Sequence, residues 1–260
     1  MKKILALILA VSMLFVVAAC SKPATEETTA ADAETTAADT ETDASVMTYE
    51  EYAAAEIDSA VCVETYVQAK QSWWNDKACL YLQDADGAYF IYNAVCSQED
   101  YGKLAVGTKI KVTGKKAEWK GEMEVGEGAT FVIEDGSYIA KPFDATALLG
   151  NDDELIKHQN KLVAFKGLTV AAKKDDNGNE CAFFYGYSNE GEEGSDSDLY
   201  FDVTLGDQTY TLSVEYYLCD ETTDVYQAVQ NLKVGDKIDV EGFLYWYSTQ
   251  STQVTSITVL

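Results

Sequence analysis

Apolar and polar residues alternate in several short segments of the first half of the chain, and each such segment predicts a strand. The first segment has Val61, Val63, Thr65 and Val67 on one face, as expected for a strand that covers a core. Two arms, 79–83 and 88–96, flank the turn sequence Asp84-Ala85-Asp86-Gly87 and predict a hairpin. A helical turn is expected from Ser97, followed by further strands through Ile110 and Val112 and around 130–134.

An eleven-residue motif occurs twice and relates the two halves of the chain. Residues 104–114 read LAVGTKIKVTG and residues 232–242 read LKVGDKIDVEG, so seven of eleven positions are identical at an offset of 128. In each copy the Ile-x-Val alternation predicts a strand with one buried face. The closing Gly114 or Gly242 suits a bend or bulge in that strand. The repeat predicts two copies of one small β-domain.

The second half follows the same order with one insertion. A helical lead-in at 152–157 precedes a strand at 162–172, and segments 200–205 and 208–216 predict a hairpin across Gly206-Asp207. Val225, Ala228, Val229 and Leu232 have helical spacing, and the repeated strand and a last strand at 254–260 follow. Residues 61–64 align with 163–166 at an offset of 102, so about 26 extra residues, including the acidic loop 189–198, separate the first and fourth strands.

Each copy therefore has the order strand, strand, strand, helix, strand, strand, which is the order of the OB-fold, a partly open five-stranded barrel. The predicted fold class is all-β with short helices, in two tandem OB-fold-like five-stranded barrels. A small immunoglobulin-type β-sandwich is the rival fold, and the helix at 225–232 disfavours it. Over residues 55–140 and 160–260 the chain resembles the tandem OB-fold surface lipoproteins of Gram-positive bacteria. The resemblance leaves the ligand open, because OB-folds host many ligands.

The first residues of the chain predict export. Met1-Lys2-Lys3 precedes an apolar run that ends at Ala19, which is short for a membrane span and suits a signal peptide of residues 1–19. The sequence Val17-Ala18-Ala19-Cys20-Ser21 resembles the lipobox of bacterial lipoproteins, with valine where leucine is usual, and implies lipidation of Cys20. An ordinary secretory signal with a chance cysteine is the alternative.

The lipobox resemblance places the protein on the outer face of the bacterial cytoplasmic membrane, anchored through Cys20. Residues 20–46 are rich in Thr, Ala, Glu and Asp, so they cannot bury enough apolar surface to fold and predict a disordered acidic tether. The expected domains are then 47–145 and 146–260, the second with the insertion.

The chain is strongly acidic, which restricts its partners. Its net charge is −25, and all 19 basic residues are lysine. Phosphate recognition depends on arginine forks and on a positive field. Nucleic acid and anionic membrane surfaces are therefore disfavoured as partners, and neutral ligands, cations or other proteins are favoured.

Aromatic residues concentrate in the loops that OB-folds use for binding, which join strands one to two and four to five. The predicted ligand-binding residues are Trp73, Trp74 and Trp119 in the first copy and Tyr245, Trp246 and Tyr247 in the second. Flat aromatic rings stack on sugars or bases. The alternative is that these rings close the open ends of small barrels. Four strand tyrosines either extend the platform or are half-buried strand residues, namely Tyr66, Tyr81, Tyr185 and Tyr187.

Five cysteines follow Cys20, and an extracellular location permits disulfides among them. Cys79 and Cys96 lie near each other across the open end of the first hairpin, and Cys181 and Cys219 are the two cysteines of the second copy. These pairs are disulfide candidates, with Cys62 left over. Free, packed thiols are the alternative. No Cys-x-x-Cys spacing indicates zinc or redox chemistry.

The sequence contains no recognisable catalytic set. His158 is the only histidine and is expected at the surface, and no Gly-x-Ser-x-Gly motif or phosphate-binding glycine loop is present. The Asp-rich turns 84–87 and 175–178 fit turn chemistry better than calcium loops, and the acidic residues of 190–198 are expected to be solvated. We therefore expect no catalytic residue, no metal and no cofactor.

Three functions remain open on sequence alone. The first is a non-catalytic surface lipoprotein that binds a neutral ligand such as a glycan through its barrel aromatics. The second is a protein–protein interaction module of the cell envelope. Single-stranded nucleic-acid binding, by analogy with other OB-folds, ranks last because of the negative charge.

Overall fold

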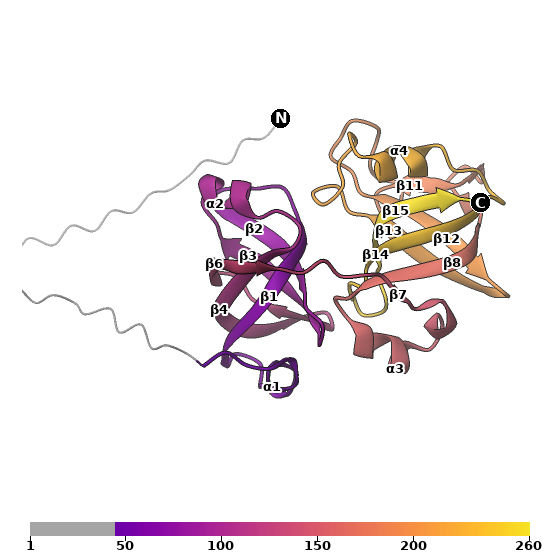
Figure 1. Ribbon diagram of the computed structural model, residues 1–260. Helices are drawn as coiled ribbons and strands as arrows, with labels where there is room; N and C mark the ends of the chain where they lie inside the picture. The colour runs from indigo at the N-terminus through magenta and orange to yellow at the C-terminus, as the bar shows by residue number, and fades with distance from the viewer. Residues whose placement is uncertain (1–44) are drawn as a thin grey trace, which may run out of the picture. The chain divides into compact units, whose positions relative to one another are not determined.

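The computed structural model describes residues 45–260, which contain two β-barrels (Figure 1). The predicted signal peptide 1–19, the lipidation site Cys20 and the tether up to residue 44 lie outside the described residues. Both barrels belong to one compact unit. Within residues 45–260, no helix is long and apolar enough to cross a lipid bilayer.

The first barrel is a sheet with the order β1-β2-β3-β5-β4-β6, closed by the antiparallel pairing of β1 with β4. The parallel pairing of β3 with β5 completes an OB-type barrel. Its elements are α1 (Tyr49–Ala54), β1 (Ala60–Lys70), β2 (Lys77–Gln83), β3 (Ala88–Val95), α2 (Gln98–Lys103), β4 (Thr108–Trp119), β5 (Glu122–Val125) and β6 (Thr130–Ser137). The predicted strand at 130–134 is β6, and β5 precedes it, so the fifth strand has two pieces that both pair with β4.

The second barrel is a sheet with the order β11-β12-β13-β15-β14-β8-β7, closed by the pairing of β12 with β8. Its elements are β7 (Phe143–Asp144), η1 (Thr146–Leu148), α3 (Asp152–Leu155), η2 (Ile156–His158), β8 (Leu162–Val170), β9 (Lys173–Lys174), β10 (Glu180–Cys181), β11 (Phe183–Tyr185), β12 (Leu199–Leu205), β13 (Gln208–Val214), α4 (Asp224–Gln230), β14 (Lys237–Phe243) and β15 (Gln253–Val259). The insertion contributes the small strands β9, β10 and β11. The prediction of two tandem OB-like barrels is confirmed.

The strand registers show that the two barrels are copies of one arrangement. In the first barrel Val61 pairs with Gly114 and Val63 with Val112. In the second barrel Val163 pairs with Gly242 and Phe165 with Val240, which are the positions related by the offsets 102 and 128. The repeated motif therefore occupies equivalent strands, β4 and β14.

The closing glycine of each motif is required by close strand approach. A Cβ atom added to Gly114 would lie 2.5 Å from Val125 Cγ1, and one added to Gly242 would lie 2.3 Å from the carbonyl oxygen of Gln253. Any side chain at either position would collide with the fifth strand of its barrel, consistent with the role of glycine where two backbones approach closely. In β14 the pairing with β15 also shifts register between Glu241 and Gly242, as the sequence suggested for a bulge.

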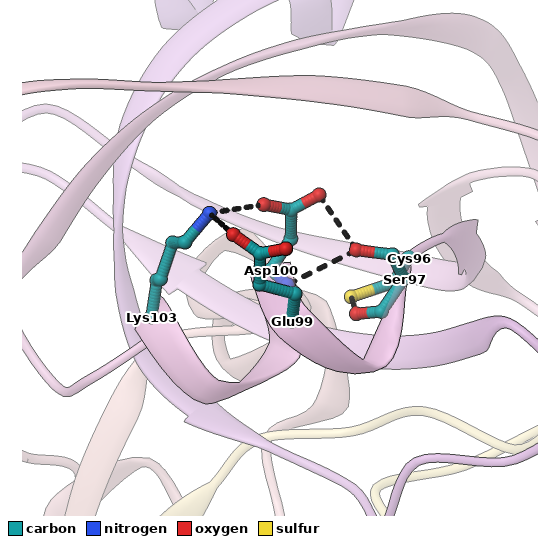
Figure 2. A network of polar contacts seen from close by, with 5 residues as sticks. All are labelled: Cys96, Ser97, Glu99, Asp100 and Lys103. Atoms are coloured by element: carbon teal, nitrogen blue, oxygen red, sulfur yellow. Dashed lines mark hydrogen bonds and ion pairs between the residues drawn. The ribbon is translucent and has the colours of Figure 1, made fainter.

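Each short helix of the first barrel begins at a capping residue. Thr48 and Glu51 form a capping box at the start of α1. At α2, the hydroxyl of Ser97 accepts a hydrogen bond from Asp100 N at 3.0 Å, and Lys103 forms ion pairs of 2.9 Å with Glu99 and Asp100 (Figure 2). These local contacts stabilise a helix that has only six residues.

The segment between the barrels belongs structurally to the second barrel. β7 pairs in parallel with β8, and Ala145 is fully buried in the second core. The boundary expected at 145/146 therefore falls inside this segment. His158, expected at the surface, is half-buried and stacks on Phe143 with ring centroids 4.4 Å apart, because β7 brings the phenyl ring over η2.

Each barrel encloses its own hydrophobic core, and a third cluster joins them. Val63, Leu80 and Ile110 belong to the first core, and Phe165 and Phe201 to the second. The third cluster packs the buried residues Cys79, Tyr81 and Phe90 of the first barrel against Phe243 of the second. The barrels are therefore held together by apolar side chains on the outer face of β2 and β3.

Polar contacts surround the joining cluster. Trp246 N donates to Glu122 Oε2 at 2.8 Å, and Leu162 N donates to Gln83 Oε1 at 2.8 Å. Glu122 is fully buried, and burial raises the pKa of its carboxyl to about 9. The carboxyl is therefore protonated at neutral pH, which avoids placing an uncompensated charge between the barrels.

Candidate ligand-binding cleft

A cleft of about 1040 Å³ lies on the outer face of the second barrel. Its floor is formed by Tyr200 of β12 and residues 209–213 of β13. Residues of the β14–β15 loop (244–252), Tyr187 and Asp198 from the insertion after β8, and Gly150 and Asp152 before β8 also line it. In OB-fold terms these are strands two and three with the loops that join strands one to two and four to five. OB-folds bind oligosaccharides and oligonucleotides at this position.

The floor is largely polar, and in β12 buried and partly exposed residues alternate from Leu199 to Val203. Leu199, Phe201 and Val203 point into the core, so the residues between them face outward. The outward residues are Tyr200, Asp202 and Thr204 on β12, opposite Ser213, Thr211 and Thr209 on β13. Of these six, Tyr200, Thr209, Thr211 and Ser213 line the cleft, and all four carry a hydroxyl group.

Five tyrosines line the cleft, namely Tyr187, Tyr200, Tyr210, Tyr245 and Tyr247. Tyr187 and Tyr200 meet edge to face with ring centroids 5.5 Å apart. The Tyr200 hydroxyl donates to Asp198 Oδ2 at 3.3 Å. These rings give the cleft flat apolar surfaces beside its polar floor.

Three carboxylates also line the cleft, from Asp152, Asp198 and Glu215, and no lysine does. Asp198 Oδ1 accepts a hydrogen bond from Tyr216 N at 2.9 Å, and Glu215 Oε2 accepts one from Leu218 N at 2.6 Å. Burial raises the pKa of Glu215 to about 7, with repulsion from Asp198 as the next cause, and burial also raises the pKa of Asp198. Backbone amides therefore hold both groups in place.

The β14–β15 loop is fixed by its own contacts. Trp246 is only 5% exposed and packs on the β4–β5 turn, where a Cβ atom on Gly121 would lie 2.8 Å from its ring. Gln250 Nε2 donates to the carbonyl of Thr211, and Gln250 Oε1 accepts from the Thr252 hydroxyl at 2.8 Å. This anchoring presents Tyr245 and Tyr247 to the cleft.

The same face of the first barrel is covered. Tyr81 on β2 is 1% exposed, and its ring lies 4.6 Å from that of Phe243. Phe90 on β3 meets Tyr245 edge to face at 5.4 Å. The second barrel thus occupies the position at which the first would hold a ligand.

The structure divides the six predicted ligand-binding residues into four groups. Tyr245 and Tyr247 line the cleft, and Trp246 is buried as a plug. Trp74 and Trp119 are 79% and 56% exposed on the first barrel, and neither lines the cleft. The remaining residue, Trp73, is half-buried, with Nε1 donating to the carbonyl of Cys96 at 2.8 Å.

Of the four strand tyrosines, only Tyr187 lines the cleft. Tyr81 lies in the joining cluster, Tyr66 packs on Tyr138, and the hydroxyl of Tyr185 accepts from Gln230. Sequence reasoning missed Tyr200, Tyr210, Asp198 and Glu215. The signal for Tyr200 was the alternation of LYFDVTL in β12, whereas β2 and β3 are almost continuously apolar, which is typical of strands buried on both faces.

All five cysteines among the described residues are free thiols, so neither candidate disulfide is present. Cys79 lies in the joining cluster and Cys96 in the first core, on opposite faces of their sheet. Cys181 Sγ lies 3.7 Å from the carbonyl oxygen of Lys173, and Cys219 is buried in the second core. Residues 45–260 contain no group of three or more His, Cys, Asp or Glu placed to hold a metal ion.

No protein-family model matches the chain, and no curated protein sequence is significantly similar to it. Among solved structures, the aspartyl tRNA synthetase from Entamoeba histolytica is 14% identical with a TM-score of 0.30 over 43% of this chain, which spans 27% of the synthetase. The Ifi202 HINa domain in complex with 20bp dsDNA is 11% identical with a TM-score of 0.35, covering 78% of this chain and 98% of that one. A murine DNA-binding protein bound with dsDNA is 12% identical with a TM-score of 0.33, covering 76% and 95%. The fold assignment rests on the strand order and register, and these distant likenesses carry no information on the ligand.

Proposed function

We propose that this protein is a non-catalytic surface lipoprotein that binds a glycan in the cleft of its second barrel. The observation that carries the proposal is the cleft on β12 and β13, with tyrosine rings beside a floor of hydroxyl groups. Sugars present apolar ring faces and many hydroxyls, so stacking surfaces and hydrogen-bonding side chains together suit them. The sequence pointed to a similar ligand but placed half of the predicted aromatic residues on the first barrel, away from the cleft.

The carboxylates of the cleft support binding rather than hydrolysis. Glycosidases use a pair of acidic residues that flank the scissile bond. Here Asp198 and Glu215 each accept a backbone amide in a turn, which is a positioning role within the protein fold. Incubation of the protein with a bound glycan should therefore yield no shorter products, as followed by mass spectrometry.

Lipid anchoring on the outer face of the cytoplasmic membrane is part of the same proposal. It is supported by the lipobox-like sequence that ends at Cys20. Metabolic labelling of a bacterial host with a fatty-acid analogue should label the full chain and leave Cys20→Ala unlabelled. Equal labelling of both forms would contradict the anchor.

Nucleic acid is a poor fit to the cleft. The chain has a net charge of −25 and no arginine, and the cleft is lined by carboxylates without a lysine. A phosphate backbone would be repelled by this surface. Binding of an oligonucleotide that weakened steeply with salt would count against the proposal.

A glycan array on the full chain, with matched variants, tests the proposed site. Tyr187 and Tyr247 are exposed at the cleft, so the double change to alanine should abolish glycan binding without unfolding the protein. The double change of Trp74 and Trp119 to alanine removes equally exposed rings from the first barrel and should leave binding intact. The opposite pattern would move the site to the first barrel.

A protein-interaction module of the cell envelope is the second candidate function. It is favoured by the exposure of Trp74 and Trp119 outside the cleft, since large exposed aromatic residues occur at protein interfaces. Cross-linking in intact cells that depends on these two tryptophans, and not on Tyr187 or Tyr247, would support this function over glycan binding.

A further inference from the structure

The charge of the cleft is not balanced within the protein. Asp152, Asp198 and Glu215 are the ionisable carboxyl groups that line it, and the other lining residues carry no positive charge. Lys173, near the same sheet face, is engaged in an ion pair with Asp202 at 3.0 Å and lies over the ring of Phe184. A cleft lined by charges of one sign concentrates the field within it and attracts ligands of the opposite sign.

We propose that the ligand of the cleft carries an ammonium group, as an amino sugar does, and that Asp198, Glu215 and the neighbouring tyrosines receive that group. This inference rests on the proposed glycan function and names the chemical class of the glycan. Ammonium groups bind carboxylates through charge-assisted hydrogen bonds and bind aromatic faces through cation–π attraction.

The geometry brings these groups together at one end of the cleft. Asp198 is hydrogen-bonded to the Tyr200 hydroxyl, and Tyr200 meets Tyr187 edge to face. Glu215 lies on the segment that follows β13, where the backbone of Tyr216 binds Asp198. Each carboxylate has acceptor capacity beyond the hydrogen bonds that hold it in place, so a ligand ammonium can be bound without breaking the turn.

The surroundings of the two carboxyl groups contain further acids and no base. Glu190 and Asp198 both act electrostatically on Tyr200, and Glu190 also repels Asp198. On the first barrel, burial is the main cause that raises the pKa of Cys79 and of Tyr81, and the charge of Glu215 raises both further. A neutral sugar would leave this repulsion in place, whereas an ammonium group would relieve it and favour ionisation of both carboxyl groups.

Isothermal titration calorimetry of the full chain with a matched pair of glycans tests the inference. The pair is the tetramer of N-acetylglucosamine and its fully de-N-acetylated form, which share one backbone and differ in their ammonium groups. We expect the amino form to bind at least tenfold more tightly, with an advantage that shrinks as salt is raised. n-Butylamine, an ammonium group without a sugar, is the third probe.

The outcomes separate this inference from the proposed function. Equal or tighter binding of the acetylated form would overturn the ammonium inference and leave glycan binding in place. Binding of n-butylamine with no binding of either tetramer would support an ammonium site and contradict the glycan function. Failure of both the amino tetramer and n-butylamine to bind would overturn the inference.

Isosteric variants show whether the two carboxylates are responsible. Asp198→Asn and Glu215→Gln keep an acceptor for the backbone amide and remove the charge, so each should lower the affinity for the amino form about tenfold and leave the acetylated form nearly unchanged. Glu241→Gln, on the exposed side of β14 and outside the cleft, is the matched control and should change neither. An unchanged preference in the double variant Asp198→Asn/Glu215→Gln, with native thermal stability, would overturn the assignment.

Discussion

The two barrels share strand order and register but use the same outer face in opposite ways. In the first barrel this face carries Cys79, Tyr81 and Phe90 and is covered by the second barrel. In the second barrel the corresponding strands β12 and β13 carry hydroxyl-bearing side chains and form the floor of an open cleft. The two copies therefore differ: the outer face of the first barrel is covered, and that of the second forms an open cleft.

The difference lies in the outward residues, since the inward residues are apolar in both barrels. An apolar outer face is removed from water only by contact with another surface, and its burial is favourable. A face of threonine, serine and tyrosine remains solvated without such a partner. Burial of the aromatic residues of β2 and β3 therefore favours packing of the second barrel against the first. In this arrangement Phe90 of the first barrel contacts Tyr245, a residue of the cleft.

Loss of the joining cluster has the largest expected effect. Phe243→Ala removes the second barrel's buried residue in this cluster and should lower the free energy of unfolding by about 3–5 kcal/mol, as buried phenylalanine losses do. Thr209→Ala, on the exposed equivalent face of β13, should change it by less than about 0.5 kcal/mol. Urea denaturation measures both. A loss below about 1 kcal/mol for Phe243→Ala would mean that the barrels do not depend on this cluster.

The two closing glycines differ in the atoms that a side chain at each position would meet. Gly242→Ala meets the backbone oxygen of Gln253, whereas Gly114→Ala meets the side chains of Val125 and Ala129. Backbone atoms shift less easily than side chains, so we expect Gly242→Ala to lower the free energy of unfolding by about 1–3 kcal/mol. We expect a smaller loss for Gly114→Ala. Gly102→Ala in α2, with nothing within 4 Å of its added Cβ, is the control and should stabilise by about 0.5–1 kcal/mol. The reverse order in thermal denaturation would refute the clash argument.

The buried carboxyl between the barrels predicts how stability depends on pH. Folding raises the pKa of Glu122 to about 9, so above the pKa of the unfolded chain, about 4.3, the folded state binds more protons than the unfolded state. Its contribution to stability is complete below pH 4.3 and is lost as the pH rises towards 9. The slope for one proton is about 1.4 kcal/mol per pH unit at most.

Glu122→Gln removes this proton linkage and keeps an acceptor for Trp246 N. Urea denaturation at pH 5 to 8 should show a shallower fall of the free energy of unfolding in the variant than in the original chain. Glu124, whose pKa burial raises to about 7, and Glu215 contribute to both proteins, so the difference between the two slopes reports Glu122. Parallel slopes would show that Glu122 titrates as it does in the unfolded chain.

The smallest effect concerns the contact that links the first barrel to the cleft. The Tyr81 hydroxyl donates to Gln253 Oε1, a residue of the cleft, and accepts from Gln71 Nε2 at 3.0 Å. Tyr81→Phe should lower stability by about 0.5–1.5 kcal/mol and weaken glycan binding through Gln253. Tyr217→Phe, an exposed tyrosine at the same junction, should do neither. Unaltered binding in Tyr81→Phe would separate the first barrel from the function of the cleft.

The fold was predictable to a large extent because its signals are local. The period-two alternation, the turn at 84–87, the helical turn from Ser97, and the motif repeated at 104–114 and 232–242 each depend on neighbours in sequence. The split of the fifth strand into β5 and β6 was not predictable, since it depends on the path of β4. The position of residues 143–145 against the second barrel was not predictable either, since it depends on the pairing of β7 with β8.

The site was predictable in part. The loop rule of OB-folds led to Tyr245 and Tyr247, but the same rule placed Trp73, Trp74 and Trp119 on a first-barrel platform that does not contribute to the cleft. A tryptophan in a loop has the same sequence signature whether its ring is exposed, as in Trp74, or a plug, as in Trp246. Whether such a ring is exposed or buried depends on which other part of the protein packs against it.

By itself, the amino-acid sequence determined two copies of one five-stranded barrel, the negative charge and the absence of arginine, because periodicity, repetition and composition are properties of the chain. Only the tertiary structure decided that the second barrel covers the outer face of β2 and β3 in the first and that Asp198, Glu215 and five tyrosines line the cleft left open. Those residues come from strands and loops distant in sequence, and a cleft exists only where the packing of the barrels leaves a surface uncovered.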